Sequence, residues 1–210
     1  MISICHISDT HETHRKLHIP YSDILIHSGD FTFQGDLGKV KEFLSWFDAQ
    51  QSRYRVLIAG NHDKSFHKTP DLTKLLLSEF PEITYLENSG TEIEGIKIWG
   101  SPYTPTFGHG WAFNCNIDKI QNHWDLIPTD TQILVTHGPP FGILDKTAYG
   151  DLVGCESLLQ TVKKIKPELH LFGHIHEGYG LLFEDGITFS NGCNLDERYI
   201  PINMPRIIEL

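Results

Sequence analysis

Residues 56–63 read Val56-Leu57-Ile58-Ala59-Gly60-Asn61-His62-Asp63, so four apolar residues lead directly into a glycine and three polar side chains. An unbroken apolar run of this kind is typical of a strand that is buried on both faces of a sheet. Asn61 and His62 are costly to bury after such a strand unless their polar atoms find partners. The stretch therefore predicts a buried strand whose end carries functional side chains.

Four further segments repeat this arrangement of a polar motif after an apolar run. They are Asp9-Thr10-His11, Gly29-Asp30, Thr136-His137-Gly138 and Gly173-His174-Ile175-His176. In an α/β layer structure, the loops at the carboxyl ends of strands gather at one edge of the sheet, so all five segments are expected to converge. Alternation along a strand end puts both side chains of Asp9-x-His11 on one side. Glycines before Asp30, Asn61 and His174 permit tight turns of the backbone.

The apolar patterns elsewhere alternate between helices and strands. Helices are expected at residues 38–51, 71–80, 116–124 and 155–165, a hairpin at 90–101 and an irregular loop at 102–116. Further strands are expected at residues 2–8, 23–27, 55–59, 132–136, 169–172, 179–183, 187–190 and 206–210. Early βαβ alternation followed by hairpins predicts an α/β fold of two mixed sheets with helices outside. A length of 210 residues predicts a single domain over residues 1–210.

Composition narrows the class of protein. Hydrophobic residues make up 40% and charged residues 21% of the chain, which is typical of a globular protein and excludes a disordered chain or a coiled coil. The net charge of −10 argues against a stable complex with nucleic acid and against binding to an anionic membrane. Four scattered cysteines predict reduced thiols, and no stretch is apolar enough to span a membrane. With no signal sequence recognisable, we expect a cytoplasmic protein.

The side chains of the five motifs share one chemistry. Asp, Asn and His offer oxygen and nitrogen ligands that suit Mn, Fe, Zn or Ni. The chain contains 13 histidines, a high number for its length, and neutral imidazole is the commonest metal ligand in proteins. Each motif alone is a weak signal, but all five in this order, each after an apolar strand, predict a metal site.

Taken together, the five motifs resemble those of the calcineurin-like metallophosphoesterase superfamily, over positions 9 to 176. The surrounding sequence is similar to one branch, the small metallophosphoesterase-domain proteins related to cyclic-nucleotide phosphodiesterases. That likeness rests on Ile7-Ser8-Asp9-Thr10-His11, Gly29-Asp30-Phe31-Thr32, Gly100-Ser101-Pro102-Tyr103-Thr104-Pro105, Trp111-Ala112-Phe113-Asn114 and Gly173-His174-Ile175-His176-Glu177-Gly178-Tyr179-Gly180. Some vertebrate members of the branch lack the last metal-binding histidine, which this chain keeps as His176.

The resemblance implies a four-layer α-β-β-α sandwich and two divalent metal ions, with manganese favoured over iron, zinc or nickel. It implies seven metal ligands: Asp9, His11 and His176 on one ion, Asn61, His137 and His174 on the other, and Asp30 between both. A hydroxide that bridges the two ions is the implied nucleophile. His62 is then expected beside the substrate phosphate, oriented by Asp63, as the catalytic pair.

A small phosphodiester of the cyclic-nucleotide kind is the expected substrate. The motifs contain no arginine, and a dianionic monoester needs more cations than a monoanionic diester. Four residues are candidates for contact with the substrate: His14, His109, Trp111 and Phe113. Two alternatives stay open, namely a phosphomonoesterase or protein phosphatase, and a non-catalytic scaffold of the same fold. The complete set of polar residues favours an enzyme over a scaffold, and the oligomeric state is left open.

Overall fold

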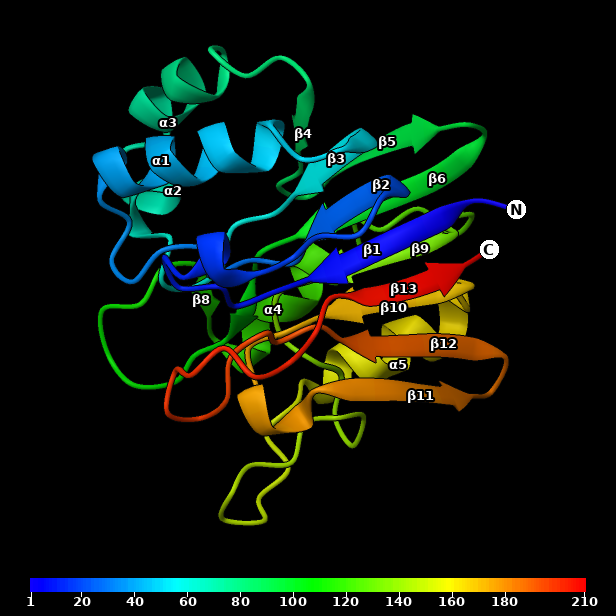
Figure 1. The fold of residues 1–210 in the computed structure, drawn as a ribbon. Coiled ribbons are helices and arrows are strands. Elements are labelled where there is room, and N and C mark those ends of the chain that lie inside the picture. The colour runs from blue at the N-terminus through cyan, green and yellow to red at the C-terminus, as the bar shows by residue number, and fades with distance from the viewer.

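Two large sheets form the centre of the computed structural model, which describes residues 1–210 (Figure 1). The strands of the first sheet are β1 (Ser3–Ile7), β2 (Ser22–His27), β3 (Ser52–Leu57), β4 (Ile83–Tyr85) and β13 (Arg206–Glu209). They lie in the order β13-β1-β2-β3-β4. β1 to β4 run parallel to one another, whereas β13 pairs with β1 in the antiparallel sense. The first sheet is therefore mixed.

The second sheet is also mixed. Its strands are β5 (Ser89–Ile93), β6 (Ile96–Ser101), β9 (Ile133–Thr136), β10 (Leu169–Phe172), β11 (Gly180–Glu184) and β12 (Ile187–Asn191). They lie in the order β11-β12-β10-β9-β6-β5, with antiparallel strands at both edges. β5 and β6 form the expected hairpin, which turns at Glu94 and Gly95 with φ of 50° and 81°. Two successive positive φ angles are the requirement of a type I′ turn, which matches the twist of the strands.

Helices cover the outer face of each sheet. The helices are α1 (Leu37–Asp48), α2 (Lys64–Lys68) and α3 (Pro70–Leu77) beside the first sheet, and α4 (Ile117–Trp124) and α5 (Glu156–Ile165) beside the second (Figure 1). α1 begins where the Asp36 carboxylate accepts a hydrogen bond from the Lys39 amide at 3.1 Å. It buries Val40, Phe43 and Leu44 against the sheet, as their helical spacing predicts.

Alternation along the strands divides the core into separate layers. Ile24 and Ile26 of β2 face the second sheet, in a cluster of 13 buried residues that fills the space between the two sheets. Leu25, between them, belongs to a cluster of 14 buried residues that includes the inner face of α1. A third cluster of 11 buried residues joins the second sheet to Trp124 of α4 and Val162 of α5. The layers are therefore α-β-β-α, and the predicted architecture is confirmed.

Three features differ from the sequence prediction. β4 and α2 were not expected, because a strand of three residues and a helix of five are too short to show a period. The segment at 102–116, expected as an irregular loop, contains β7 (Thr104–Pro105) and β8 (Asn114–Cys115). These two short strands pair in parallel with residues 106–113 between them. Neither an apolar period nor a tight-turn sequence therefore indicates them in the sequence.

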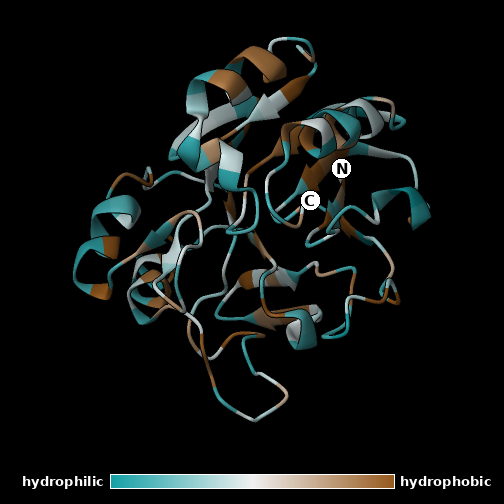
Figure 2. Ribbon diagram, turned by 90° about the vertical axis from the view of Figure 1, so that its left-hand side faces the viewer, coloured by the Kyte–Doolittle hydropathy of each residue, from teal (hydrophilic) through white to brown (hydrophobic).

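All five polar motifs follow strands that end at the same side of the molecule. β1, β2 and β3 are parallel neighbours in the first sheet, and β9 and β10 are parallel neighbours in the second. Figure 2 faces this edge and shows it covered by loops. None of the helices has the length and hydrophobicity that a membrane-spanning segment requires.

Candidate metal centre

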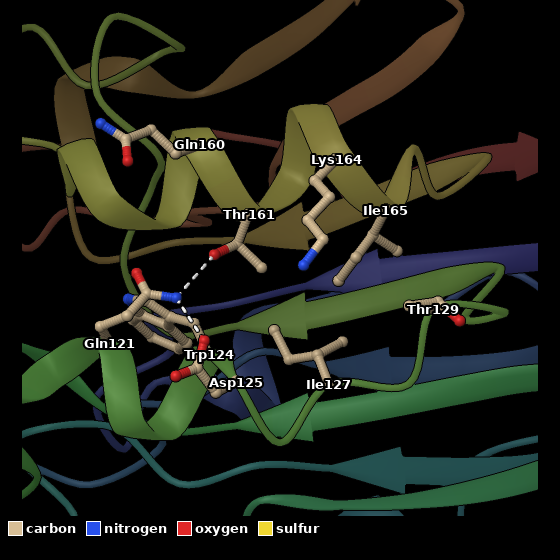
Figure 3. A pocket seen from close by; sticks show the side chains of 9 residues that line it. All are labelled: Gln121, Trp124, Asp125, Ile127, Thr129, Gln160, Thr161, Lys164 and Ile165. Atoms are coloured by element: carbon tan, nitrogen blue, oxygen red, sulfur yellow. Dashed lines mark hydrogen bonds between the residues drawn. The ribbon is translucent and has the colours of Figure 1, made fainter.

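A cavity of about 280 Å³ lies at the carboxyl edge of the strands. It is lined by residues of the motifs and by others that the motifs did not include: His11, Asp30, Asn61, His62, Phe107, Trp111, His174, Ile175, His176, Glu177, Glu197 and Tyr199. A cavity of similar volume lies between α4 and α5 (Figure 3). There the Gln121 amide donates to Asp125 and Thr161, and no residue of the five motifs lines the cavity. The candidate site is therefore the first cavity.

The carboxylate of Asp30 stands at the middle of this site. Its Oδ2 atom lies 3.4 Å from Nε2 of His137 and 3.9 Å from Nε2 of His11. Nε2 of His62 is 4.0 Å away. The other oxygen, Oδ1, accepts a hydrogen bond from the His62 amide at 2.7 Å, which fixes the carboxylate. One oxygen of Asp30 is thus held by the backbone while the other faces imidazoles from the loops after β1, β3 and β9.

Asp9 is held in the same way, with one oxygen fixed and one left over. Oδ2 accepts hydrogen bonds from the Ser8 hydroxyl at 2.6 Å, the His174 amide at 2.8 Å and the Cys193 thiol at 3.2 Å. Oδ1 lies 3.6 Å from Nε2 of His176 and 3.9 Å from Nε2 of His11. Asp9 therefore presents a single free oxygen to these two imidazoles.

Three of the imidazoles are oriented by backbone carbonyl groups. Nδ1 lies 3.1 Å from the Thr32 oxygen in His11, 2.9 Å from the Ser28 oxygen in His137 and 2.7 Å from the Asp196 oxygen in His176. A carbonyl oxygen only accepts, so each Nδ1 carries the proton that it donates. Nε2 is then the atom that each ring presents to the site, as is usual for metal-ligating histidines.

The donor set fits divalent metal ions. The Oδ1 atom of Asp9 and the Nε2 atom of His11 are buried and have no hydrogen-bond partner, although a buried polar atom normally has one. His, Cys and carboxylate atoms come within 4.8 Å of one another in three groups: Asp9, His176 and Cys193; His11, Asp30 and His62; and Asp30, His137 and His174. Oxygen and imidazole nitrogen ligands in such groups suit first-row transition metals.

Charge in the site also matches cation binding. Burial lowers the pKa of His11 to about 4 and that of His174 to about 3, so both rings are neutral at pH 7. Burial opposes the charged form of His137 and His176 too, but the carboxylates of Asp30 and Asp9 raise the pKa of each to about 9. A metal ion that binds His137 and His176 must displace the protons on their Nε2 atoms. Metal binding is therefore expected to release protons.

The backbone is strained at four of the motif residues. Asp9, His11, Asp30 and His174 have φ of 51°, 36°, 57° and 69°, in the left-handed region that residues other than glycine seldom adopt. Such conformations cost free energy and concentrate at functional sites. The turns bring the side chains of adjacent strands into one place.

Two motif glycines serve close approach between backbones and ligands. A Cβ atom on Gly60 would lie 2.2 Å from Oδ1 of Asp30, and one on Gly173 would lie 2.0 Å from Oδ2 of Asp9. No other residue leaves room for these carboxylates. The sequence predicts tight turns at Gly29, Gly60 and Gly173. Of these three, only Gly29, with φ of 103°, has the positive φ of such a turn.

Comparison with known proteins agrees with this geometry. The family model for calcineurin-like phosphoesterases matches residues 2–178. The chain belongs to the calcineurin-like phosphoesterase family. It is therefore a metal-dependent phosphoester hydrolase, and the resemblance drawn from the motifs is confirmed.

Relatives of this phosphoesterase include animal proteins. Metallophosphoesterase domain-containing protein 1 of Homo sapiens is 38% identical over 227 residues, covering 97% of this chain and 69% of the human protein. UPF0046 protein K07C11.7 of Caenorhabditis elegans is 37% identical over 202 residues, covering 90% of this chain and 69% of that protein.

Solved structures share the fold at much lower identity. TT1561 of Thermus thermophilus superposes with a TM-score of 0.63 at 12% identity, covering 90% of this chain and 88% of that one. GAP50, described as the anchor in the inner membrane complex of Plasmodium, has a TM-score of 0.54 at 9% identity, covering 92% and 71%. These likenesses concern the fold alone, so the activity must be argued from the site.

In this phosphoesterase the expected catalytic pair is arranged differently from the prediction. Nδ1 of His62 lies 2.8 Å from the Phe33 carbonyl oxygen, which orients the ring, and not near the Asp63 carboxylate. Asp63 instead accepts hydrogen bonds from the amides of Gly60, Asp30 and Thr32, each at 2.9 Å. The interpretation that Asp63 orients the His62 ring is therefore wrong. Asp63 ties the loop after β3 to the loop after β2, and so positions Asp30.

Of the four residues expected to contact substrate, only Trp111 lines the cavity. Its ring centre lies 4.4 Å from that of His62. His14 is buried against Phe43 and Trp46 because α1 packs over it, so it does not reach the cavity. Phe113 is fully buried in the core between α1 and the first sheet, and His109 is exposed beyond the cavity. We correct the expected substrate contacts accordingly.

Four further cavity residues stand outside the five short motifs. Phe107 lies in the segment between β7 and β8, and Glu177 directly follows His176. Glu197 and Tyr199 come from the loop between β12 and β13, which reaches the same edge of the sheets in Figure 1. No motif, spacing or repeat marks Glu197 and Tyr199, so only the fold brings these two residues to the site.

The buried imidazole of His170 makes the stability of the fold depend on pH. His170 of β10 is fully buried, and its Nε2 lies 2.9 Å from the Thr136 hydroxyl. That hydroxyl donates its one proton to the Gly138 carbonyl at 2.7 Å, so Nε2 of His170 must be the donor between them. Nδ1 of His170 has no partner, and burial lowers the pKa of the ring to about 3. The folded protein therefore holds this imidazole neutral.

We expect His170→Phe to weaken the loss of stability in acid. Above pH 6.5 the ring is neutral in both states, whereas between pH 6.5 and 3 only the unfolded chain takes up the proton, so stability falls as pH falls. The ring accounts for about 2 kcal/mol of the loss between pH 7 and 5, from 1.36 kcal/mol per pKa unit. Urea unfolding of the metal-free protein at both pH values measures this. Exposed His18→Phe is the control, and an equal acid loss in His170→Phe and the unsubstituted protein contradicts the prediction.

Proposed function

We propose that this chain is a dinuclear phosphodiesterase that acts on small diesters, with manganese as the favoured metal. The proposed ligands are Asp9, His11 and His176 for one ion, Asn61, His137 and His174 for the other, and Asp30 for both. One observation carries the proposal, namely the position of Oδ2 of Asp30 between Nε2 of His11 and Nε2 of His137. These two imidazoles come from different sheets, so a carboxylate between them suits a ligand shared by two ions.

The charge of the ligand set suits an anionic substrate. Two divalent ions held by these residues would polarise a phosphoryl oxygen and lower the pKa of a bound water, which would supply the nucleophile. Only two of the seven proposed ligands, Asp9 and Asp30, bring negative charge. The other five are neutral when they bind metal and leave a positive balance for the ester.

His62 is proposed as the general acid. Because Nδ1 donates to the Phe33 carbonyl, Nε2 is the atom that faces the site, 4.0 Å from Oδ2 of Asp30. A proton on Nε2 is then placed to pass to the leaving oxygen of the ester, a role that is worth typically 10²–10⁴-fold in rate. The side chain is 13% exposed, so the proton can be replaced from solvent.

Two features of the cavity support a diester over a monoester. No lysine or arginine lines it, whereas Glu177 and Glu197 do, and these carboxylates disfavour the second negative charge of a monoester. A second cavity of about 260 Å³ shares Phe107, His174 and Ile175 with the first. Its apolar lining could hold the second ester group of a diester. A monoester has no such second group.

The two alternatives are less well supported. A phosphomonoesterase or protein phosphatase needs additional fixed cations at the cavity, and its lining residues include no lysine or arginine. A scaffold has no use for buried metal-binding atoms without partners, such as Oδ1 of Asp9 and Nε2 of His11. A small diester also fits the acidic chain better than a stable nucleic-acid complex does.

The proposal predicts a measurable preference for diesters. Metal-free protein is reloaded with Mn, Fe, Zn or Ni and assayed on bis(p-nitrophenyl) phosphate, on p-nitrophenyl phosphate, and on 2′,3′- and 3′,5′-cyclic nucleotides. We expect kcat/KM for the aryl diester to exceed that for the monoester by at least about tenfold, or about 1.4 kcal/mol. A tenfold preference for the monoester under the same metal would replace the diesterase by a phosphomonoesterase.

A further inference from the structure

Tyr199 combines a strained backbone with a place in the cavity wall. It lies in the loop between β12 and β13, lines the cavity and is 42% exposed. Its φ is 61°, in the left-handed region. For a bulky aromatic residue this conformation is an outlier, and such outliers persist only where the surrounding structure enforces them. A residue that keeps this strain at a cavity wall is a candidate for a functional contact.

Asp196 holds the turn that carries Tyr199. Its carboxylate oxygen Oδ1 accepts hydrogen bonds from the amides of Arg198 at 2.9 Å and Ile200 at 2.8 Å. Its carbonyl oxygen accepts from the Tyr199 amide at 2.9 Å and from Nδ1 of His176 at 2.7 Å. The same carbonyl therefore orients a proposed metal ligand and anchors the tyrosine, so the turn belongs to the construction of the site.

The ring of Tyr199 packs on the imidazoles of the site. Its centre lies 4.9 Å from that of His11 and 5.2 Å from that of His176, both nearly edge-on. The ring of His62 also stands edge-on to His11, with the centres 4.6 Å apart. His11 thus has His62 and Tyr199 as two aromatic neighbours that both line the cavity. The hydroxyl group of Tyr199 makes no hydrogen bond within the protein, so its proton is free for a ligand.

We propose that Tyr199 is a substrate-contacting residue whose hydroxyl donates a hydrogen bond to a non-bridging phosphoryl oxygen of the ester. The inference rests on the proposed phosphoester site and adds a neutral donor to it. A neutral donor suits a monoanionic diester, because it holds an oxygen without requiring a second negative charge. Only a hydrogen bond is formed, and no proton leaves the tyrosine. The strained turn is then explained by the contact that it places in the cavity.

Tyr199→Phe tests the hydroxyl, because it keeps the ring on His11 and His176. A hydrogen bond to a charged group, lost from the bound state, corresponds to about 10- to 100-fold in affinity. We therefore expect the dissociation constant of orthovanadate for the manganese-loaded protein to rise by about that factor, and kcat for the aryl diester to fall similarly. Bound manganese and the urea midpoint of unfolding should be unchanged. Tyr149→Phe, at an exposed tyrosine of the 144–153 loop, is the control and should change nothing.

Tyr199→Gly separates a substrate contact from a structural role. Glycine adopts this φ without strain but loses the packing of the ring on His11 and His176, so the urea midpoint should fall only slightly while vanadate affinity and kcat fall at least as far as in Tyr199→Phe. A midpoint that falls in step with activity would make Tyr199 structural and overturn the inference. So would Tyr199→Phe with vanadate affinity and kcat within twofold of the unsubstituted protein. The unsubstituted protein could prefer monoesters while Tyr199→Phe lowers its activity. In that case the diester proposal fails and the tyrosine contact stands.

Discussion

Asp30→Asn is expected to abolish hydrolysis and to lower the metal content of the protein. Asparagine keeps the size of the side chain and an oxygen that can accept from the His62 amide, but it removes the carboxylate that faces His11 and His137. Metal ions contribute several kcal/mol of transition-state stabilisation. At 1.36 kcal/mol per tenfold in rate, the loss is on the order of 10³-fold or more.

Metal analysis and kcat on the same samples measure both effects. We expect fewer than two manganese equivalents in Asp30→Asn and activity near background. Asp151→Asn, at an exposed aspartate, is the matched control and should retain metal and activity. Two tightly bound equivalents together with substantial turnover in Asp30→Asn would show that Asp30 is not the shared ligand.

His62→Gln is expected to lower kcat by about 10²–10⁴-fold while both metal ions stay bound. Glutamine can still donate to the Phe33 carbonyl but offers no transferable proton where Nε2 stands. A general acid matters most for a poor leaving group. The loss should therefore be larger for a dialkyl phosphodiester, which must expel an alkoxide, than for bis(p-nitrophenyl) phosphate, which expels a phenolate.

The matched control for His62 is His109→Gln. His109 was a candidate from the sequence but lies outside the cavity lining, so its substitution should leave kcat within about twofold. Loss of a whole metal equivalent in His62→Gln would make His62 a ligand, as its place in a group with His11 and Asp30 allows. An equal loss for good and poor leaving groups would argue against the acid role.

Most of the fold could be predicted from local sequence, because a polar motif follows each of β1, β2, β3, β9 and β10. The apolar run at 56–59 followed by Gly60 and Asn61 needs no tertiary information to be recognised. Parallel strands end at one edge, so convergence of the motifs follows from the topology. The structure brings all seven proposed ligands to that edge.

The directions in which the side chains point could not be predicted from the sequence. His62 and Asp63 are chain neighbours, yet three amides hold the Asp63 carboxylate on the inner side while His62 faces the cavity. Phe113 was expected in the cavity wall, but its φ of 51° turns the chain so that the ring enters the core. Tyr199 stands at the site in a turn that the Asp196 carboxylate closes by accepting two backbone hydrogen bonds. These outcomes depend on contacts between segments far apart in the chain.

The most direct test of a two-metal site is a titration of metal-free protein with manganese, with binding and aryl diester hydrolysis followed together. A dinuclear mechanism predicts no hydrolysis in verified metal-free protein, two bound equivalents at saturation, and activity that appears with occupation of both sites. Proton release should accompany binding, because His137 and His176 carry protons at pH 7 before the metal arrives. Full hydrolysis without metal, or full activity at one bound equivalent, would contradict the dinuclear mechanism.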